Sequence, residues 1–83
     1  MKVEANQLVE LDIVAIGQRE ERGIVVDVAE LEGKIFVAIE YFDHVQYYSF
    51  LPGECVFRCT DIAFYDLREQ HSIMRLKRRG RRT

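Results

Sequence analysis

The amino-acid sequence predicts a mainly β protein, a small barrel of five short strands followed by a C-terminal α-helix and a basic tail. The segments 23–31, 34–42 and 45–51 each have the alternation of strands, and only two residues separate each from the next. After residue 60 the apolar residues recur at a spacing near that of a helix. Five short strands in fewer than 60 residues favour a barrel, because closure removes exposed strand edges.

Length and composition predict one folded domain. A chain of 83 residues has room for a small core, and 48% hydrophobic residues are typical of a globule rather than of a disordered chain. We expect residues 1–60 to form the barrel and residues 61–83 to add the helix and an Arg-rich tail. The apolar run 35–39 is too short to span a membrane, and residues 1–5 lack the apolar core of a secretory signal. We therefore expect a cytoplasmic protein with no membrane partner.

The first strand is predicted over residues 8–16, after a polar lead-in of residues 1–7. Its cleaner apolar side carries four residues, Val9, Leu11, Ile13 and Ala15. A charged loop follows at residues 17–22. Gly23 then lets the chain turn or bulge into the second strand.

The register of the three central strands follows from their turns. A turn at Glu32 and Gly33 predicts that Glu30 faces Ile35, Val28 faces Val37, Val26 faces Ile39 and Ile24 faces Tyr41. A turn at Asp43 and His44 predicts that Tyr41 faces Gln46, Ile39 faces Tyr48 and Val37 faces Phe50. Because alternate residues share a face, one face is the predicted core: Ile24, Val26, Val28, Ile35, Val37, Ile39, Tyr41, Tyr48 and Phe50. The opposite face carries Val25, Asp27, Ala29, Phe36, Ala38, Glu40, Phe42, Val45, Tyr47 and Ser49.

The last strand is predicted over residues 55–60, after a turn at 51–54 in which Pro52 and Gly53 occupy the positions that a type II turn prefers. Cys55 and Cys59 share one face of this strand. Four strand residues span about 13 Å, which is too far for a disulfide. We expect two reduced thiols that behave as small, partly buried apolar side chains.

The helix is predicted over residues 62–79, with Thr60 or Asp61 as its N-terminal cap. Its apolar residues are Ile62, Tyr65, Ile73 and Leu76, with Phe64, Leu67 and Met74 beside them. Residues 77–83 are predicted to form a disordered basic tail. Charge is divided unevenly, since residues 1–67 carry a net charge of −8 and residues 68–83 carry +6.

Residues 8–60 resemble SH3-like barrels, with the KOW and Tudor-like groups closest. The resemblance rests on four segments: Asp12-Ile13-Val14 before a charged loop, Gly23-Ile24-Val25-Val26-Asp27-Val28, Val37-Ala38-Ile39-Glu40-Tyr41, and Leu51-Pro52-Gly53-Glu54 before the last strand. Likeness to KOW domains implies binding to RNA or the ribosome. Likeness to Tudor-like domains implies a site of aromatic residues on adjacent strands beside an acidic residue.

The sequence predicts neither an enzyme nor a cofactor site. No Ser or Cys has a clear His partner, and Cys55 or Cys59 with His71 matches no nucleophile motif in order or spacing. The same cysteines with His44 and His71 are four potential metal ligands. Structural zinc favours tighter cysteine pairs on turns, so buried thiols and two surface histidines are the favoured interpretation.

The densest charge lies near the C-terminus, where six cations follow one another closely: Arg75, Lys77, Arg78, Arg79, Arg81 and Arg82. Such a run can neutralise the phosphates of nucleic acid. It can equally bind an acidic protein, fold back on the acidic body of this chain, or remain a solvated end. The sequence leaves these alternatives open.

A second candidate site lies on the face opposite the predicted core. It comprises Phe36, Glu40, Phe42 and Tyr47, with Glu40 paired to Tyr47. Exposed aromatic residues mark interaction surfaces, and a neighbouring carboxylate favours a cationic ligand. The alternative is that the C-terminal helix covers this face through Ile62, Tyr65 and Leu67.

These features predict a non-catalytic interaction module, an adaptor or regulator that contacts a protein or a second copy of itself. Nucleic acid is a further expected partner, through the basic tail. The first alternative is a KOW-like protein whose barrel also contacts RNA or DNA. The second alternative is an accessory subunit of an enzyme.

Overall fold

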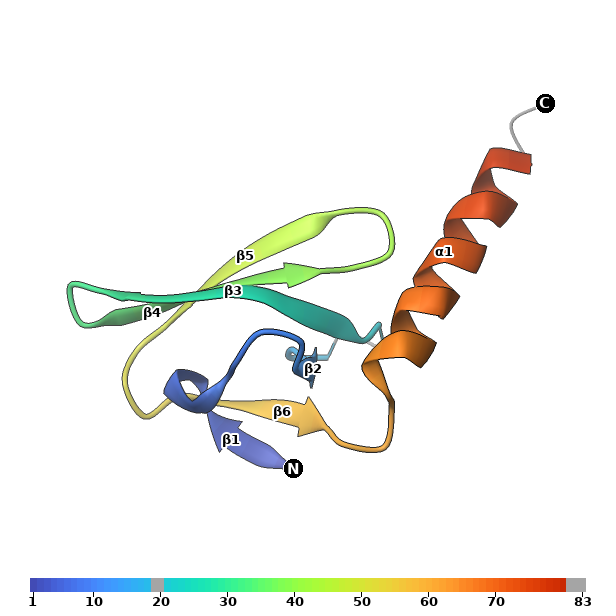
Figure 1. Cartoon of the computed structure of the whole chain (residues 1–83). Helices are drawn as coiled ribbons and strands as arrows, with labels where there is room; N and C mark the ends of the chain where they lie inside the picture. The colour runs from blue at the N-terminus through green and yellow to red at the C-terminus, as the bar shows by residue number, and fades with distance from the viewer. Residues whose placement is uncertain (19–20, 81–83) are drawn as a thin grey trace.

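The computed structural model describes residues 1–18 and 21–80, which form one antiparallel sheet and one long helix (Figure 1). The elements in chain order are β1 (Lys2–Glu4), the 3₁₀-helix η1 (Ala5–Gln7), β2 (Ile13–Ala15), β3 (Gly23–Leu31), β4 (Lys34–Glu40), β5 (Val45–Phe50), β6 (Cys55–Cys59) and α1 (Phe64–Gly80). The strands lie side by side in the order β1-β6-β2-β3-β4-β5. The mainly β class with a C-terminal helix is confirmed.

The prediction of a closed five-stranded barrel is wrong, because the described residues form an open sheet of six strands. The extra strand is β1, from the segment predicted to be a loose lead-in. Val3 pairs with Val56 of β6, and the Ala5 N–H donates to the Glu54 carbonyl at 2.9 Å. Val3, Ala5 and Leu8 are all buried, so apolar burial holds this segment against the sheet.

The first predicted strand is shortened to β2. Leu11 has a φ of 76°, and the Asp12 side chain accepts a hydrogen bond from the Val9 N–H at 3.0 Å. This turn leaves Val9 and Leu11 more than half exposed, which corrects their predicted place in the core. Both faces of β2 are covered instead, because Val14 packs in one apolar cluster and Ile13 in another.

The hairpin of β3 and β4 has the predicted turn and, near that turn, the predicted register. Glu32 and Gly33 have φ values of 54° and 76°, and Val28 faces Val37. Positive φ at both central residues matches the tight hairpin turns that suit twisted strands. The Glu32 and Gly33 turn is therefore confirmed.

A β-bulge interrupts the same hairpin between Val25 and Asp27. Beyond it Val25 faces Ile39 and Ile24 faces Glu40, so the predicted partners of Val26 and Ile24 are wrong. Val25 is fully buried, whereas Val26 is 39% exposed. The Val25 backbone is hydrogen-bonded on the other side of β3, to residues 11 and 12. Its carbonyl accepts from the Leu11 N–H and its N–H donates to the Asp12 carbonyl, both at 2.8 Å.

The strands β4 and β5 pair with an offset of two residues from the prediction. Val37 faces Tyr48 and Ile39 faces Gln46, around a loop at residues 41–44. An even offset keeps every side chain on its predicted face. The inner face of β4 therefore carries Ile35, Val37 and Ile39, and its outer face carries Phe36, Ala38 and Glu40.

Two apolar clusters occupy the two sides of the sheet. The inner cluster joins residues from most of the strands: Val3, Ala5, Leu8, Val14, Val25, Ile35, Val37, Ile39, Tyr41 and Val56, with Ile16, Val28, Tyr48 and Phe50 against them. The smaller outer cluster lies under the start of α1 and consists of Ile13, Ile24, Cys59 and Leu67, with Ala15, Ile62 and Phe64. Ile24, which was predicted for the main core, belongs to the outer cluster because of the bulge.

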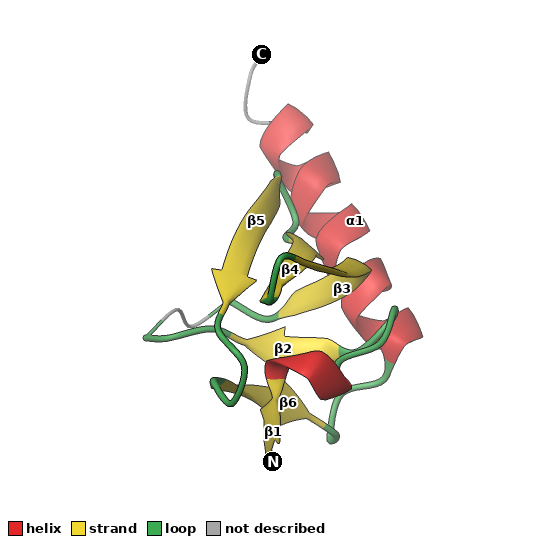
Figure 2. Cartoon of the chain, turned by 90° about the vertical axis from the view of Figure 1, so that its left-hand side faces the viewer, coloured by secondary structure: helices red, strands yellow, loops and turns green. Residues whose placement is uncertain are grey.

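The helix α1 continues to Gly80, so residues 77–80 of the predicted disordered tail are helical. Its start packs on the sheet, and its C-terminal part stands clear of the strands (Figures 1 and 2). Leu67 and His71 are buried, while Tyr65 is 81% exposed, so the prediction that Tyr65 covers the sheet is wrong. Within residues 1–18 and 21–80, no helix has the length and apolar character needed to cross a membrane.

Candidate functional site

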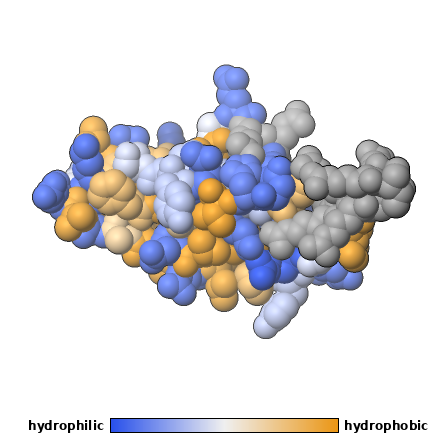
Figure 3. Space-filling model, turned by 90° about the horizontal axis from the view of Figure 1, so that it is seen from above, coloured by the Kyte–Doolittle hydropathy of each residue, from blue (hydrophilic) through white to orange (hydrophobic). Residues whose placement is uncertain are grey.

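The structure separates the four residues of the predicted aromatic site. Phe36 and Tyr47 lie on the outer face and are 41% and 75% exposed. Glu40 is paired across the strands with Val45, and Tyr47 with Ala38, so the predicted pairing of Glu40 with Tyr47 is wrong. Seen from above, the surface of the molecule shows hydrophobic residues among hydrophilic ones (Figure 3).

Glu40 contacts the helix rather than an aromatic cage. The Arg68 guanidinium of α1 donates a hydrogen bond to the Glu40 carboxylate and forms an ion pair with it. The Glu40 side chain is 17% exposed and that of Arg68 is 47% exposed. The Glu40 carboxylate is therefore paired with a cation of the same chain. That cation, Arg68, belongs to the body of α1 and not to the predicted basic tail.

Phe42 lines a groove of about 500 Å³ between α1 and the loops that precede β3 and β5. The loop wall consists of Glu21, Arg22 and Phe42, and the helix wall consists of Leu67, Gln70, His71 and Ile73. This volume lies within the range of ligand-binding pockets, about 300–1,000 Å³. We call this feature the α1 groove.

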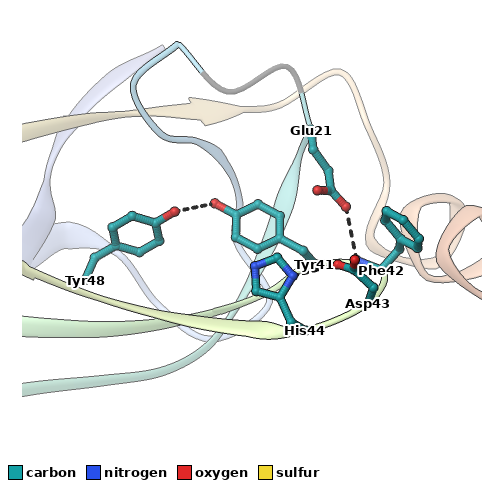
Figure 4. A network of polar contacts seen from close by, with 6 residues as sticks. All are labelled: Glu21, Tyr41, Phe42, Asp43, His44 and Tyr48. Carbon is teal, nitrogen blue, oxygen red and sulfur yellow. Dashed lines mark hydrogen bonds and ion pairs between the residues drawn. The ribbon is translucent and has the colours of Figure 1, made fainter.

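Polar contacts hold the loop wall in place (Figure 4). The Phe42 backbone N–H donates to Glu21 Oε1 at 3.1 Å and so joins the two loops. The His44 ring stacks on Tyr41 with 5.2 Å between ring centroids, and His44 Nδ1 lies 2.6 Å from Asp43 Oδ1. The Tyr41 and Tyr48 hydroxyls are 2.9 Å apart, which connects the loop to β5. The loop that presents Phe42 is thus tied to the loop before β3 and to β5, and contacts among its own residues add to this.

The helix wall has buried residues at the bottom of the groove and exposed residues at its rim. Leu67 and His71, one turn apart, are 4% and 5% exposed, whereas Ile73 is 45% exposed. Gln70 is exposed between them. The groove thus offers apolar side chains, Leu67 and Ile73, beside polar ones, His71 and Gln70, and this mixture suits an apolar group of a ligand that also forms hydrogen bonds.

The potential metal ligands and nucleophiles are dispersed. His44 lies in the loop before β5, His71 lies on α1, and the two cysteines lie at the ends of β6. Both thiols are free; Cys55 is exposed and Cys59 is buried in the outer cluster. No group of three or more His, Cys, Asp or Glu side chains is placed to hold a metal ion in the described part of the chain.

The predicted nucleic-acid-binding residues fall largely on α1. The helix includes positions 75 and 77–79, and so carries Arg75, Lys77, Arg78 and Arg79 on the part that stands clear of the sheet (Figure 1). Arg81 and Arg82 lie outside the described residues.

Sequence reasoning identified Phe42 but missed the α1 groove around it. Its residues come from three segments separated by about 20 residues or more, and no local pattern joins them. One signal was present, because His71 follows Leu67 by four positions and so shares its helical face. Comparison with known proteins found no matching family model, curated protein or solved structure.

Proposed function

We propose that this protein is a non-catalytic interaction module that binds a protein partner in the α1 groove. The observation that carries the proposal is the groove itself, with an apolar lining of Phe42, Leu67 and Ile73 beside polar side chains. The hydrogen bond from Phe42 to Glu21 supports a wall that is formed before a partner arrives. Preformed walls favour binding because less conformational freedom is lost.

The lining suggests the chemistry of the partner. Glu21 and Arg22 bring both signs of charge to one wall, and Gln70 brings an amide to the other. A segment with one apolar anchor residue between polar residues fits this arrangement, since interfaces combine an apolar centre with a polar rim. The fold supports the same class of function. We propose an open relative of SH3-like barrels, because the strands next to the meander, β2 and β6, pair with each other.

Ile73→Glu is expected to weaken partner binding strongly with little effect on folding. The substitution places a charge in the groove at a half-exposed position. Peptides selected from a random display library against the wild-type protein are the probe. Loss of an interface anchor costs about 2 kcal/mol or more, so Ile73→Glu should weaken these peptides at least tenfold.

Tyr65→Glu is the matched control, because Tyr65 is exposed on α1 and does not line the groove. It should bind the selected peptides as the wild type does. Both variants should melt within a few degrees of the wild type. Equal binding by both variants, or no selected peptide at all, contradicts the proposed function.

A second candidate function is nucleic-acid binding by the end of α1. It is favoured because positions 75 and 77–79 belong to the part of α1 that stands clear of the strands (Figure 1). A protruding cationic helix approaches phosphates more easily than a tail folded on the sheet would.

Replacing the six Lys and Arg residues of 75–82 by Gln is expected to eliminate binding to a non-specific duplex oligonucleotide. For the wild type, a plot of the logarithm of the association constant against the logarithm of salt concentration should have a negative slope. Because only six cations are available, this slope should be no steeper than about −5. Fluorescence anisotropy over a salt series measures this. Salt-dependent binding that survives the substitution would favour the KOW-like alternative, in which the sheet contacts nucleic acid. Full-length protein that fails to bind at low salt rejects both.

A further inference from the structure

The strand β5 leaves one edge of the sheet open. It is the terminal strand of the sheet order, and its other side pairs with no described strand. Its sequence, Val45-Gln46-Tyr47-Tyr48-Ser49-Phe50, contains no charge, proline or glycine. Natural edge strands are usually shortened, charged or interrupted, because an open edge pairs with other chains. The opposite edge, β1, follows that rule, with only three residues of which Lys2 and Glu4 are charged.

The hydrogen-bond pattern shows which backbone groups of β5 face outward. The Tyr41 N–H donates to the His44 carbonyl at 2.8 Å, and these residues continue the register in which Glu40 faces Val45. Antiparallel pairs alternate between bonded and non-bonded. Gln46, Tyr48 and Phe50 therefore bond to β4. The N–H and C=O groups of the alternate residues, Val45, Tyr47 and Ser49, point away from the sheet.

The same three residues are accessible. Their side chains share the outer face, where Val45 is 44% exposed, Tyr47 is 75% exposed and Ser49 is also exposed. An approaching strand thus meets free backbone groups and uncovered side chains together. The start of α1 packs in the outer cluster at β2, β3 and β6, and Arg68 of α1 pairs with Glu40 of β4, so the contacts given for the helix are with strands other than β5.

We propose that β5 pairs with β5 of a second copy of this chain, antiparallel and about a two-fold axis at Tyr47. In this register Tyr47 faces Tyr47 of the second copy, and Val45 faces Ser49 of the second copy. Every outward donor and acceptor of the strand gains a partner. No charge opposes a like charge, and the two Tyr47 rings form an aromatic cross-strand pair.

A second copy fits this edge better than a strand of another protein for two reasons. The interface is self-complementary, as two-fold pairing requires. The strand also lacks charged side chains, which are the usual means of selecting one foreign strand over others. Because only a short strand pairs, the dimer is weak and forms at high protein concentration. The outward residues of β5, Val45, Tyr47 and Ser49, do not line the α1 groove, so the test of self-association is separate from the test of the proposed function.

Sedimentation velocity over a concentration series tests the proposal. The wild type should shift from monomer to dimer as concentration rises. Tyr47→Lys should remain a monomer, since two like charges then meet on the axis. Ala29→Lys is the control, because Ala29 is exposed on the outer face of β3, away from the edge, and should dimerise normally.

Mixing charge variants tests the two-fold axis. Tyr47→Lys and Tyr47→Glu should each be monomeric alone and should form a heterodimer when mixed, with added salt weakening it. A wild type that is monomeric at every concentration overturns the proposal and leaves the edge to a strand of another protein. Dimerisation that persists in Tyr47→Lys also overturns it, since the interface then lies elsewhere.

Disulfide trapping in a Cys55→Ser background tests the register without a charge change. Residues in a bonded antiparallel pair have Cα atoms about 5.5 Å apart, which suits a disulfide. Tyr47→Cys should therefore cross-link two copies on mild oxidation. Ser49→Cys should not, because the two Ser49 positions lie about 13 Å apart in this register. Equal cross-linking by both variants contradicts the assigned axis.

Discussion

Val25→Asp is expected to unfold the protein, whereas Val26→Asp is expected to leave it folded. Val25 is fully buried in the inner cluster, and Val26 is 39% exposed. An unpaired carboxylate in an apolar interior costs several kcal/mol, a large part of the 5–15 kcal/mol that stabilises a typical domain. At Val26 the cost is the lower strand propensity of Asp, about 1 kcal/mol or less.

Urea denaturation followed by circular dichroism measures both variants. Val26→Asp should unfold in one transition at a slightly lower urea concentration than the wild type. Val25→Asp should lack a folded baseline. Val25→Ala and Val26→Ala extend the comparison without a charge, and only the first should lose stability markedly. Equal losses for the two Asp variants would contradict the bulge.

The bulge explains why sequence alternation assigns these two residues incorrectly. From Gly23 to Val26 no polar residue marks which side is exposed, so alternation was continued from the hairpin turn. That continuation holds from Leu31 to Asp27, where Glu30 faces Ile35. It fails at the bulge, beyond which Val25 rather than Val26 faces Ile39 and is hydrogen-bonded to residues 11 and 12. A contact between segments distant in the chain decides the register, and alternation within one strand cannot report it.

Elements with a strong local signal were predictable. Gly33 marks a tight turn, and the alternation of β4 assigns its two faces correctly even though the β5 register was offset by two residues. The strand β1 was missed because Lys2-Val3-Glu4 is too short to show a period. Its burial depends on Val56, more than 50 residues away in the sequence. Closure of the barrel was predicted from the number of strands. In the described residues β1 is added beside β6, and the outer edge of β5 pairs with no strand.

The two candidate sites, the outer aromatic residues and the α1 groove, also differ in how far the sequence predicts them. Phe36 and Tyr47 are exposed because they lie on the outer face of β4 and β5. The alternation of apolar and polar residues within each strand is enough to predict that face. The α1 groove depends on where the helix crosses the sheet. The sequence named Ile62, Tyr65 and Leu67 as residues that could cover the sheet. Ile62 and Leu67 do belong to the outer cluster, whereas Tyr65 is exposed and His71, which was not named, is buried. The link between Arg68 and Glu40 shows how that orientation is held. Spacing within the helix puts Leu67 and His71 on one side but does not by itself indicate that this side, rather than the side of Tyr65, faces the sheet.

Gly23→Ala is expected to destabilise the protein by about 1–3 kcal/mol, as overpacking of a filled core does. Gly23 begins β3 opposite Val14 and is buried. A Cβ atom at this position would overlap Ile39 Cγ2 and lie 3.0 Å from Tyr41 Cε1. Both neighbours are fully buried, so neither has space to move. The chain therefore requires glycine here for close packing, since its φ is not in the left-handed region.

A double-mutant cycle with Ile39→Ala separates packing from other causes. Ile39→Ala alone should cost about 2–5 kcal/mol because it leaves a cavity. Combined with Gly23→Ala, the loss should be smaller than the sum of the single losses, since the new methyl occupies part of that cavity. Gly53→Ala is the control. It is strained by a φ of 88° but has no atom within 4 Å of the new Cβ, so its cost should simply add to that of Ile39→Ala. An additive Gly23 and Ile39 pair would show that close packing is not what requires glycine at the start of β3.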